Sequence, residues 1–149
     1  MADSAEQRRT DTSYLDGALG YVLRCAQLAV FRDVSAVFAD VPITIGQFSA
    51  LAVIQDNPGI SQAALAAALQ VDRPRIVPVL DAMERQGWTV RKTGESDRRV
   101  RRLHLTAEGE AVLADLQHRF AAHQYRMLQR LDGVDAEVLM KALRQLAGV

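Results

Sequence analysis

Residues 72–106 decide the fold, and they read DRPRIVPVLDAMERQGWTVRKTGESDRRVRRLHLT. Four apolar residues within them follow the i, i+3, i+4, i+7 spacing that places side chains on one face of a helix: Ile76, Val79, Leu80 and Met83. Gly87 comes after this stripe, and glycine readily adopts the left-handed backbone conformation that ends many helices. The stretch therefore opens with an amphipathic helix that ends at Gly87.

Two strand-like runs follow this helix, Trp88–Lys92 and Val100–Leu105, and the residues between them are able to reverse the chain. The region is rich in cations, with seven basic side chains against two acidic ones from Arg85 to Arg102. Cations gathered on a hairpin beside a helix are typical of a surface that binds a polyanion, such as the DNA phosphate backbone.

The segment just upstream adds a second, shorter helix. Ser61 is a favourable N-cap residue, and residues 63–69 are alanines and leucines with high helix propensity. Gln70 and Val71 then form a tight turn, and Asp72 is placed to cap the next helix. Two short helices followed by a hairpin make a winged helix-turn-helix, whose second helix enters the major groove of DNA.

In this order and spacing, these segments resemble the MarR family of bacterial transcription regulators. The resemblance runs from about Leu15 to Leu146, and its most specific parts are Leu69–Arg73, Leu80–Gly87, Asp97-Arg98-Arg99 and Leu105-Thr106. It implies a mainly α fold with a small β-hairpin wing. A winged helix-turn-helix over residues 44–106 would be flanked by dimerisation helices at 13–40 and 107–149, in a single domain that follows a disordered tail at 1–12.

Capping residues and apolar periodicity place the other helices. Thr44 and Thr106 are favourable N-cap residues, and Pro42 disfavours helical geometry in the residue before it. Helices are therefore predicted over Ser13–Ala39, Thr44–Gln55, Thr106–Leu131 and Asp135–Ala147.

The first of these helices is apolar on two faces. One face carries Leu15, Leu19, Val22, Ala26, Ala29, Val30 and Val37, and the opposite side carries Gly17, Tyr21, Leu28 and Phe31. A helix of this kind is usually buried on two faces. The family resemblance implies that a second copy of the chain covers one of them, in a two-fold homodimer. Leu139, Leu143 and Leu146 of the last helix fit that role, although an intrachain core would also explain them.

The resemblance also indicates which residues contact DNA. The candidates are Ser61, Gln62, Arg73, Pro74, Arg75, Arg98, Arg99 and Arg101, with Asp97 orienting the arginines of the wing. Arg99 would enter the minor groove or clamp a phosphate, and a solvated surface turn is the alternative. An arginine at the start of the recognition helix can bind guanine O6 and N7, or a phosphate. Ser61 lies at a helix N-terminus that suits a phosphate, although capping alone explains it equally well.

Three features of the sequence restrict this interpretation. Arg101 and Arg102 point to opposite faces of a strand, so at most one of them faces DNA directly. Gln70 stands where the family often has glycine, and a left-handed non-glycine residue costs roughly 1 to 2 kcal/mol. Pro78 falls inside the recognition helix, where relatives commonly place a polar or basic residue that faces DNA. A proline at such a position typically costs about 3 kcal/mol and bends a helix.

The resemblance further implies a small-molecule effector, such as an aromatic carboxylate or its acyl thioester, bound between the dimer helices and the winged module. The candidate ligand-binding residues are Arg24, Tyr21, Leu28 and Phe48. Arg24 is surrounded by small and apolar residues on the second face of its helix, where a cation can pair with a carboxylate or phosphate. A cross-subunit ion pair would also explain Arg24, and isolated aromatic residues are more often part of a core.

Other functional classes are less well supported by the sequence. Cys25 beside Arg24 is the one indication of a thiol-based redox sensor, and thiol-sensing relatives carry their cysteine at the position of Gly20 instead. A winged-helix protein-interaction module without DNA binding is disfavoured by the arginines of the wing. The sequence contains no evident pairing of a catalytic nucleophile with a general base, and no phosphate-binding loop. It also shows no metal cluster, because His118 and His123 lie far from a shared helix face. We therefore expect no enzyme, cofactor or metal site.

The composition of the chain limits which partners and which cellular location are expected. The 149 residues include 18 basic and 18 acidic ones, so the chain as a whole is not a general polyanion binder. No run approaches the roughly 18 apolar residues of a membrane helix, and the start is polar, so a cytoplasmic protein without membrane partners is expected. The sequence thus predicts a homodimeric, ligand-responsive repressor. It would bind a pseudo-palindromic operator with half-sites about one helical turn apart.

Overall fold

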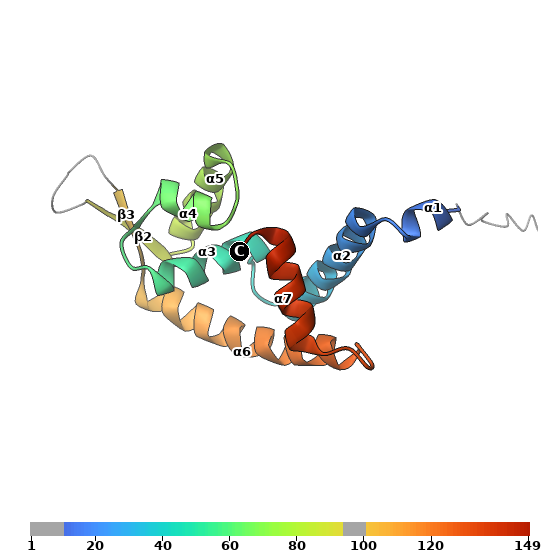
Figure 1. Ribbon diagram of the computed structural model, residues 1–149. Coiled ribbons are helices and arrows are strands. Elements are labelled where there is room, and N and C mark those ends of the chain that lie inside the picture. Colours follow the sequence, from blue (N-terminus) through green and yellow to red (C-terminus); the bar gives the residue numbers. More distant parts are fainter. Residues whose placement is uncertain (1–10, 94–100) are drawn as a thin grey trace, which may run out of the picture.

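The computed structural model describes residues 11–93 and 101–149. Its elements follow in the order α1 (Ser13–Asp16), α2 (Leu19–Val37), α3 (Ile45–Asp56), β1 (Ile60–Ser61), α4 (Gln62–Ala68), α5 (Arg73–Arg85), β2 (Thr89–Thr93), β3 (Arg101–Leu105), α6 (Ala107–Gln129) and α7 (Ala136–Ala147). Figure 1 shows the winged module at one end and α1 and α2 reaching away from it at the other. The fold is mainly helical with a small antiparallel sheet, which confirms the predicted fold class.

The single helix predicted from Ser13 to Ala39 is wrong. The chain leaves helical geometry at Gly17 and Ala18, where Ala18 is extended with φ −88° and ψ 113°, so α1 and α2 are separate helices. Glycine in a helix costs about 1 kcal/mol more than alanine, so helix propensity is low at Gly17. The start of α2 at Leu19 has no side-chain cap. At its other end α2 stops at Val37, two residues before the predicted end.

The predicted starts of α3 and α6 are confirmed, because each is held by a threonine cap. The Thr44 side chain accepts a hydrogen bond from the Gln47 backbone, and the Gln47 side chain accepts one from Thr44 N–H at 2.8 Å, which completes a capping box. Thr106 accepts a hydrogen bond from Gly109 N–H at 3.0 Å. Its hydroxyl also donates to the Gly87 carbonyl oxygen at 2.5 Å, which ties α6 to the end of the recognition helix.

The sheet is built around β3, which pairs with β2 on one side and β1 on the other. Thr89 lies opposite Leu105 and Thr93 opposite Arg101, so β2 and β3 form the predicted hairpin. The short strand β1 was not predicted. It pairs Ile60 with Leu103, and two residues are too few to show a strand periodicity.

The core lies where α2, α3, α5 and α6 meet the sheet. Ile76, Leu80 and Met83 of the predicted stripe are at most 2% exposed, and Val79 packs against them. They join Val34, Phe38, Phe48, Leu51, Ile54, Leu65, Trp88, Leu103, Leu113 and Leu116 in one cluster. Full burial of a side chain of this size stabilises the fold by roughly 1.5 to 3 kcal/mol. This cluster therefore fixes the recognition helix against the rest of the winged module.

Helix α7 differs from the other long helices because none of its residues is buried. Leu143 and Leu146 are 37% and 59% exposed, and Val138 is 65% exposed. Apolar side chains on α2 are also exposed, among them Leu19, Val22, Leu28 and Phe31. The two terminal helical segments thus leave much apolar surface uncovered within one chain.

No helix in the described part of the chain combines the length and the apolar character that crossing a membrane requires.

Candidate functional site

The turn between α4 and α5 connects two segments that carry predicted DNA-contacting residues, Ser61 and Gln62 at the start of α4 and Arg73–Arg75 at the start of α5. Ser61 caps α4 by accepting a hydrogen bond from Ala64 N–H at 3.2 Å, as predicted. Val71 N–H donates to the Ala66 carbonyl oxygen at 3.0 Å, and this turn requires Gln70 to adopt a φ of 53°. Gln70 is therefore left-handed, in the conformation that glycine would adopt without strain. The tight turn directs the start of α5 outward.

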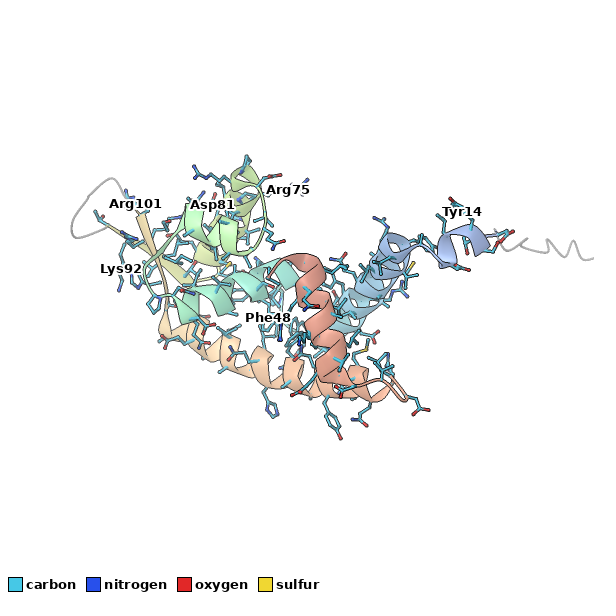
Figure 2. The ribbon with its side chains drawn as sticks, in the orientation of Figure 1. Tyr14, Phe48, Arg75, Asp81, Lys92 and Arg101 are labelled. Atoms are coloured by element: carbon cyan, nitrogen blue, oxygen red, sulfur yellow. The ribbon has the colours of Figure 1, made fainter. Side chains whose placement is uncertain are left out.

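The first turn of α5 presents the two predicted arginines to solvent. Arg73, Pro74 and Arg75 are all exposed. Asp72 occupies the N-cap position, but its side chain makes no capping hydrogen bond, so the predicted side-chain cap is not formed. Figure 2 shows Arg75 on the outer side of the module. These guanidinium groups are therefore available to bases or phosphates.

Pro78 lies within α5, and the helix continues from Arg73 to Arg85 without interruption. Pro78 itself is exposed, on the side of the helix opposite the buried Ile76 and Leu80. A proline can occupy this position because the carbonyl oxygen that it leaves without an N–H donor is that of Pro74, which is exposed and can bind water. The recognition helix thus continues through Pro78 to Arg85.

The base of the wing carries further exposed cations. Lys92 and Arg102 lie opposite each other across β2 and β3, and Arg101 lies opposite Thr93. The Arg101 guanidinium is 3.4 Å from the Thr93 hydroxyl, whereas the Arg102 guanidinium donates to the Gly59 carbonyl oxygen at 3.3 Å. In Figure 2 both Lys92 and Arg101 lie on the hairpin. The predicted wing residues Asp97, Arg98 and Arg99 lie outside the described residues.

Arg91 has a role that the sequence pattern did not indicate. Its guanidinium contacts Asp81 at 2.6 Å and Glu84 at 2.5 Å, so β2 is clamped to the recognition helix. The charge of Arg91 is therefore compensated and adds little to the basic surface. The sequence signal was weak, since only the fold brings Arg91 next to two carboxylates one helical turn apart.

A cavity of about 280 Å³ lies where α2 meets the winged module. Its lining combines residues of α2, α3, the turn before α5 and α5 itself: Phe31, Ile45, Gly46, Ser49, Leu69, Val71, Arg75, Ile76 and Val79. The walls are mostly apolar, and Arg75 is the one charged residue among them. An apolar cavity with one cation suits a small apolar molecule that carries a negative group. Its position between a terminal helix and the winged module is the one predicted for an effector cleft.

The four predicted ligand-binding residues are not brought together in this cavity. Phe48 is 8% exposed, and its ring centroid lies 5.1 Å from those of both Phe38 and Phe120. It is a core residue, as Figure 2 also shows. Arg24 is exposed and borders an open hollow between α2 and α7, beside Leu143 and Leu146.

Tyr21 is partly exposed and Leu28 is 50% exposed on α2. Arg24, Leu28 and Phe31 follow one another at i, i+4 and i+7, so they form a line along one side of α2. Phe31 lies at the cavity end of this line. Arg24 is seven residues away, which corresponds to roughly 10 Å along a helix.

Residues considered for redox or metal chemistry are scattered. Cys25 is exposed on α2. His118 is exposed, whereas His123 is 4% exposed and neither of its ring nitrogens has a hydrogen-bond partner among the residues that the structure describes. Among residues 11–93 and 101–149, no three histidine, cysteine or acidic side chains are grouped so that they could hold a metal ion.

Comparisons with known proteins agree with this geometry. The sequence profile of the MarR family matches residues 43–100. A putative transcriptional regulatory protein for the hcr operon of Thauera aromatica is 37% identical over 131 residues, which cover 87% of this chain and 79% of that protein.

Two solved structures of a transcriptional repressor, CouR, are also similar. The complex of CouR with a 23-mer DNA duplex has a TM-score of 0.87 and 37% identity, and the match covers 93% of this chain and 99% of that one. The complex of CouR with p-coumaroyl-CoA has a TM-score of 0.84 and 34% identity, with 93% and 98% covered. The chain is thus similar over 93% of its length to a repressor that was solved on DNA.

Proposed function

The chain belongs to the MarR family of transcriptional regulators, and from that premise we propose that it is a repressor released from its operator by a small anionic aromatic compound or its acyl thioester. The observation that carries this proposal is the cavity of about 280 Å³ between α2 and the winged module. Arg75 and Ile76, in the first turns of the recognition helix, form part of its wall. A ligand there would contact the helix that reads DNA.

The proposed DNA interface consists of the end of the module that carries the exposed arginines. Arg73, Arg75 and Arg101 are exposed, and with Pro74, Ser61 and Gln62 they would contact a half-site. Arg98 and Arg99 would extend this surface from the wing, oriented by Asp97. Because the net charge of the chain is zero, such local clusters rather than overall charge would attract DNA.

The proposed assembly is a homodimer formed by the terminal helices. Leu19, Val22 and Leu28 on α2 and Val138 and Leu146 on α7 are each between 47% and 65% exposed. Large apolar side chains left exposed on two helices in this way mark interaction surfaces. A two-fold dimer would cover them and would place two recognition helices on one face of an operator.

The effector is proposed to bind with its aromatic group in the cavity beside Phe31 and Val79. The cavity volume suits an aromatic acid, so the nucleotide part of an acyl thioester would lie outside. From Phe31, the line of residues along α2 leads past Leu28 to Arg24, where a guanidinium could pair with a phosphate or carboxylate. One structural relative, CouR, has been solved with p-coumaroyl-CoA, which has these chemical features.

Effector binding would release DNA through Arg75. The side chain lines the cavity and is exposed at the start of α5, so an oxygen of the ligand's aromatic part, from a carboxylate in a free acid or from the carbonyl in a thioester, would compete with DNA for the same guanidinium. A ligand shifts an equilibrium only as far as its affinities for the two states differ. Competition for one cation supplies such a difference without requiring a large movement.

The test uses a duplex that the wild-type protein selects from a random-sequence library, measured by fluorescence anisotropy with p-coumaroyl-CoA and with free p-coumarate. Wild type is expected to bind the duplex tightly and to release it when one of these compounds is added. Arg24→Met should keep DNA affinity within about threefold and raise the required effector concentration at least tenfold, about 1.4 kcal/mol.

Arg32→Met is the matched control, since it makes the same change at another exposed arginine of α2. It should leave both DNA binding and release unchanged. Equal loss of response in both variants would remove Arg24 from the effector site. A response abolished by Cys25→Ser and unaffected by Arg24→Met would favour thiol sensing instead.

A further inference from the structure

The outward face of the recognition helix has an unusual composition. Ile76, Leu80 and Met83 face the core, and the opposite side of α5 carries Pro74 and Pro78, one turn apart. Both prolines are exposed, and Val77 beside them is 38% exposed. The side of α5 opposite the core is therefore apolar over the first two turns of the helix, with the exposed Arg73 and Arg75 beside it.

Few side chains on this helix can form hydrogen bonds with bases. From Arg73 to Arg85, α5 contains no asparagine or glutamine, the residues that pair best with adenine. Arg73 and Arg75 are the hydrogen-bond donors of the first turn, and arginine prefers guanine O6 and N7. Asp81, on the next turn, is occupied by its contact with Arg91. The helix α5 can therefore recognise guanine through hydrogen bonds from arginine, and it can recognise other bases only through apolar contacts.

We propose that Pro74, Val77 and Pro78 recognise the C5-methyl groups of thymine, while Arg73 or Arg75 binds a guanine beside them. In the major groove, the thymine methyl is the apolar group that distinguishes a base, and apolar side chains contact it directly. This inference rests on DNA binding by α5, as in the proposed function. It adds the class of base that the helix selects.

The spacing of the prolines constrains the half-site further. Pro74 and Pro78 are four residues apart, which corresponds to roughly 6 Å along an α-helix. Successive base pairs are about 3.4 Å apart along one strand. If the helix follows the groove, the two prolines contact methyl groups about two base steps apart. The predicted half-site is a guanine flanked by thymines at that spacing.

Proline suits this role because its side chain has no rotamer freedom to lose on binding. Its ring presents a fixed apolar edge, and Pro78 can be accommodated because α5 is continuous through it. Pro78, which stands where related chains commonly carry a polar or basic residue, is thereby assigned a function in specificity.

The experiment compares thymine with uracil, which differs only by lacking the C5-methyl group. A duplex is first selected by wild-type protein from a random-sequence library, and each thymine of the enriched half-site is then replaced singly by uracil. Affinity should fall about fourfold at each contacted thymine, about 0.8 kcal/mol, which is the value of one buried methyl-sized group. Thymines outside the half-sites should show no change.

The variant Pro78→Ala identifies the contact. Alanine is a better helix former than proline, so the variant is expected to fold and to bind DNA. At one thymine position the uracil penalty should disappear, while the other penalties remain. Pro42→Ala, which changes an exposed proline outside α5, should keep the complete wild-type profile.

The outcomes separate this inference from the proposed function. If selection enriches no sequence, the proposed function fails and the inference fails with it. If a sequence is enriched and uracil has no effect at any position, the protein is a specific regulator and the methyl readout is wrong. If Pro78→Ala keeps every uracil penalty, Pro78 is not the contacting residue and the inference is overturned at that position.

Discussion

Replacement of Gly109 by alanine should strongly destabilise the protein, although alanine is the better helix former. Gly109 lies in the first turn of α6 and is buried against the backbone of Trp88. A Cβ atom at this position would lie 2.0 Å from the Trp88 carbonyl oxygen and 2.8 Å from its carbonyl carbon. These are backbone atoms, so no side-chain rotation relieves the overlap.

The size of the destabilisation follows from how far the overlapping atoms must move apart. Real Cβ contacts are essentially never closer than 3.0 Å, so α6 and the Trp88 backbone must separate by at least 1 Å. The same carbonyl oxygen accepts a hydrogen bond from Thr106 N–H at 3.0 Å, and that bond would be strained or lost. Overpacking typically costs 1 to 3 kcal/mol and a lost hydrogen bond about 1 kcal/mol, against about 1 kcal/mol gained in helix propensity. We expect Gly109→Ala to lower the free energy of unfolding by about 2 to 4 kcal/mol.

Gly46→Ala is the matched control, because Gly46 also lies in the first turn of a helix, α3. A Cβ atom there would meet only the Thr44 hydroxyl oxygen, at 3.9 Å. This variant should be stabilised by up to about 1 kcal/mol. Urea unfolding, followed by the fluorescence of the single tryptophan Trp88 at one protein concentration, compares the two. A stabilised Gly109→Ala protein would refute the close packing of α6 against Trp88.

Three further changes test other contacts. Arg91→Met should lower the free energy of unfolding in urea by about 0.5 to 1 kcal/mol without changing the salt dependence of DNA binding. If the slope of log K against log salt concentration fell by about 0.9, Arg91 would instead contact a phosphate. His123→Leu should raise the free energy of unfolding by about 1 kcal/mol, since the buried imidazole has no hydrogen-bond partner, and a decrease would reveal one in the assembled protein. The hydrogen bond from Arg119 lowers the pKa of Asp40 below its usual 3.8, so the ion pair stabilises the fold above about pH 4 and is lost as the pH falls through the lowered pKa. Asp40→Asn should therefore lower Tm at pH 7 and lower it less at pH 2, and an equal loss at both would exclude an ionic origin.

Much of the fold was predictable because its signals are local. The caps at Thr44, Ser61 and Thr106 each require only a hydroxyl and a backbone N–H a few residues away. The stripe that ends at Met83 and the left-handed Gly87, with φ 75°, are likewise encoded within one helix. Such features depend on neighbouring residues alone, so the sequence is sufficient to place them.

The features that were not predicted from the sequence depend on contacts between segments that lie far apart in the chain. The clamp of Arg91 on Asp81 joins a strand to a helix, and the burial of Phe48 requires Phe38 and Phe120 from two other helices. The cavity proposed for the effector likewise combines side chains of α2, α3 and α5. Family resemblance predicts an effector cleft between a terminal helix and the winged module, but it does not predict which residues line a cavity there.

Competition between an effector and DNA for the first turn of the recognition helix is tested most directly by measuring how each ligand changes the affinity of the other. The affinity of p-coumaroyl-CoA and of p-coumarate is determined by calorimetry with free protein and with protein saturated by its selected duplex. Linkage requires that DNA weakens effector binding by the same factor by which the effector weakens DNA binding. We predict a factor of at least tenfold in both directions for one of the two compounds. An effector that binds free and DNA-bound protein with equal affinity would contradict the account.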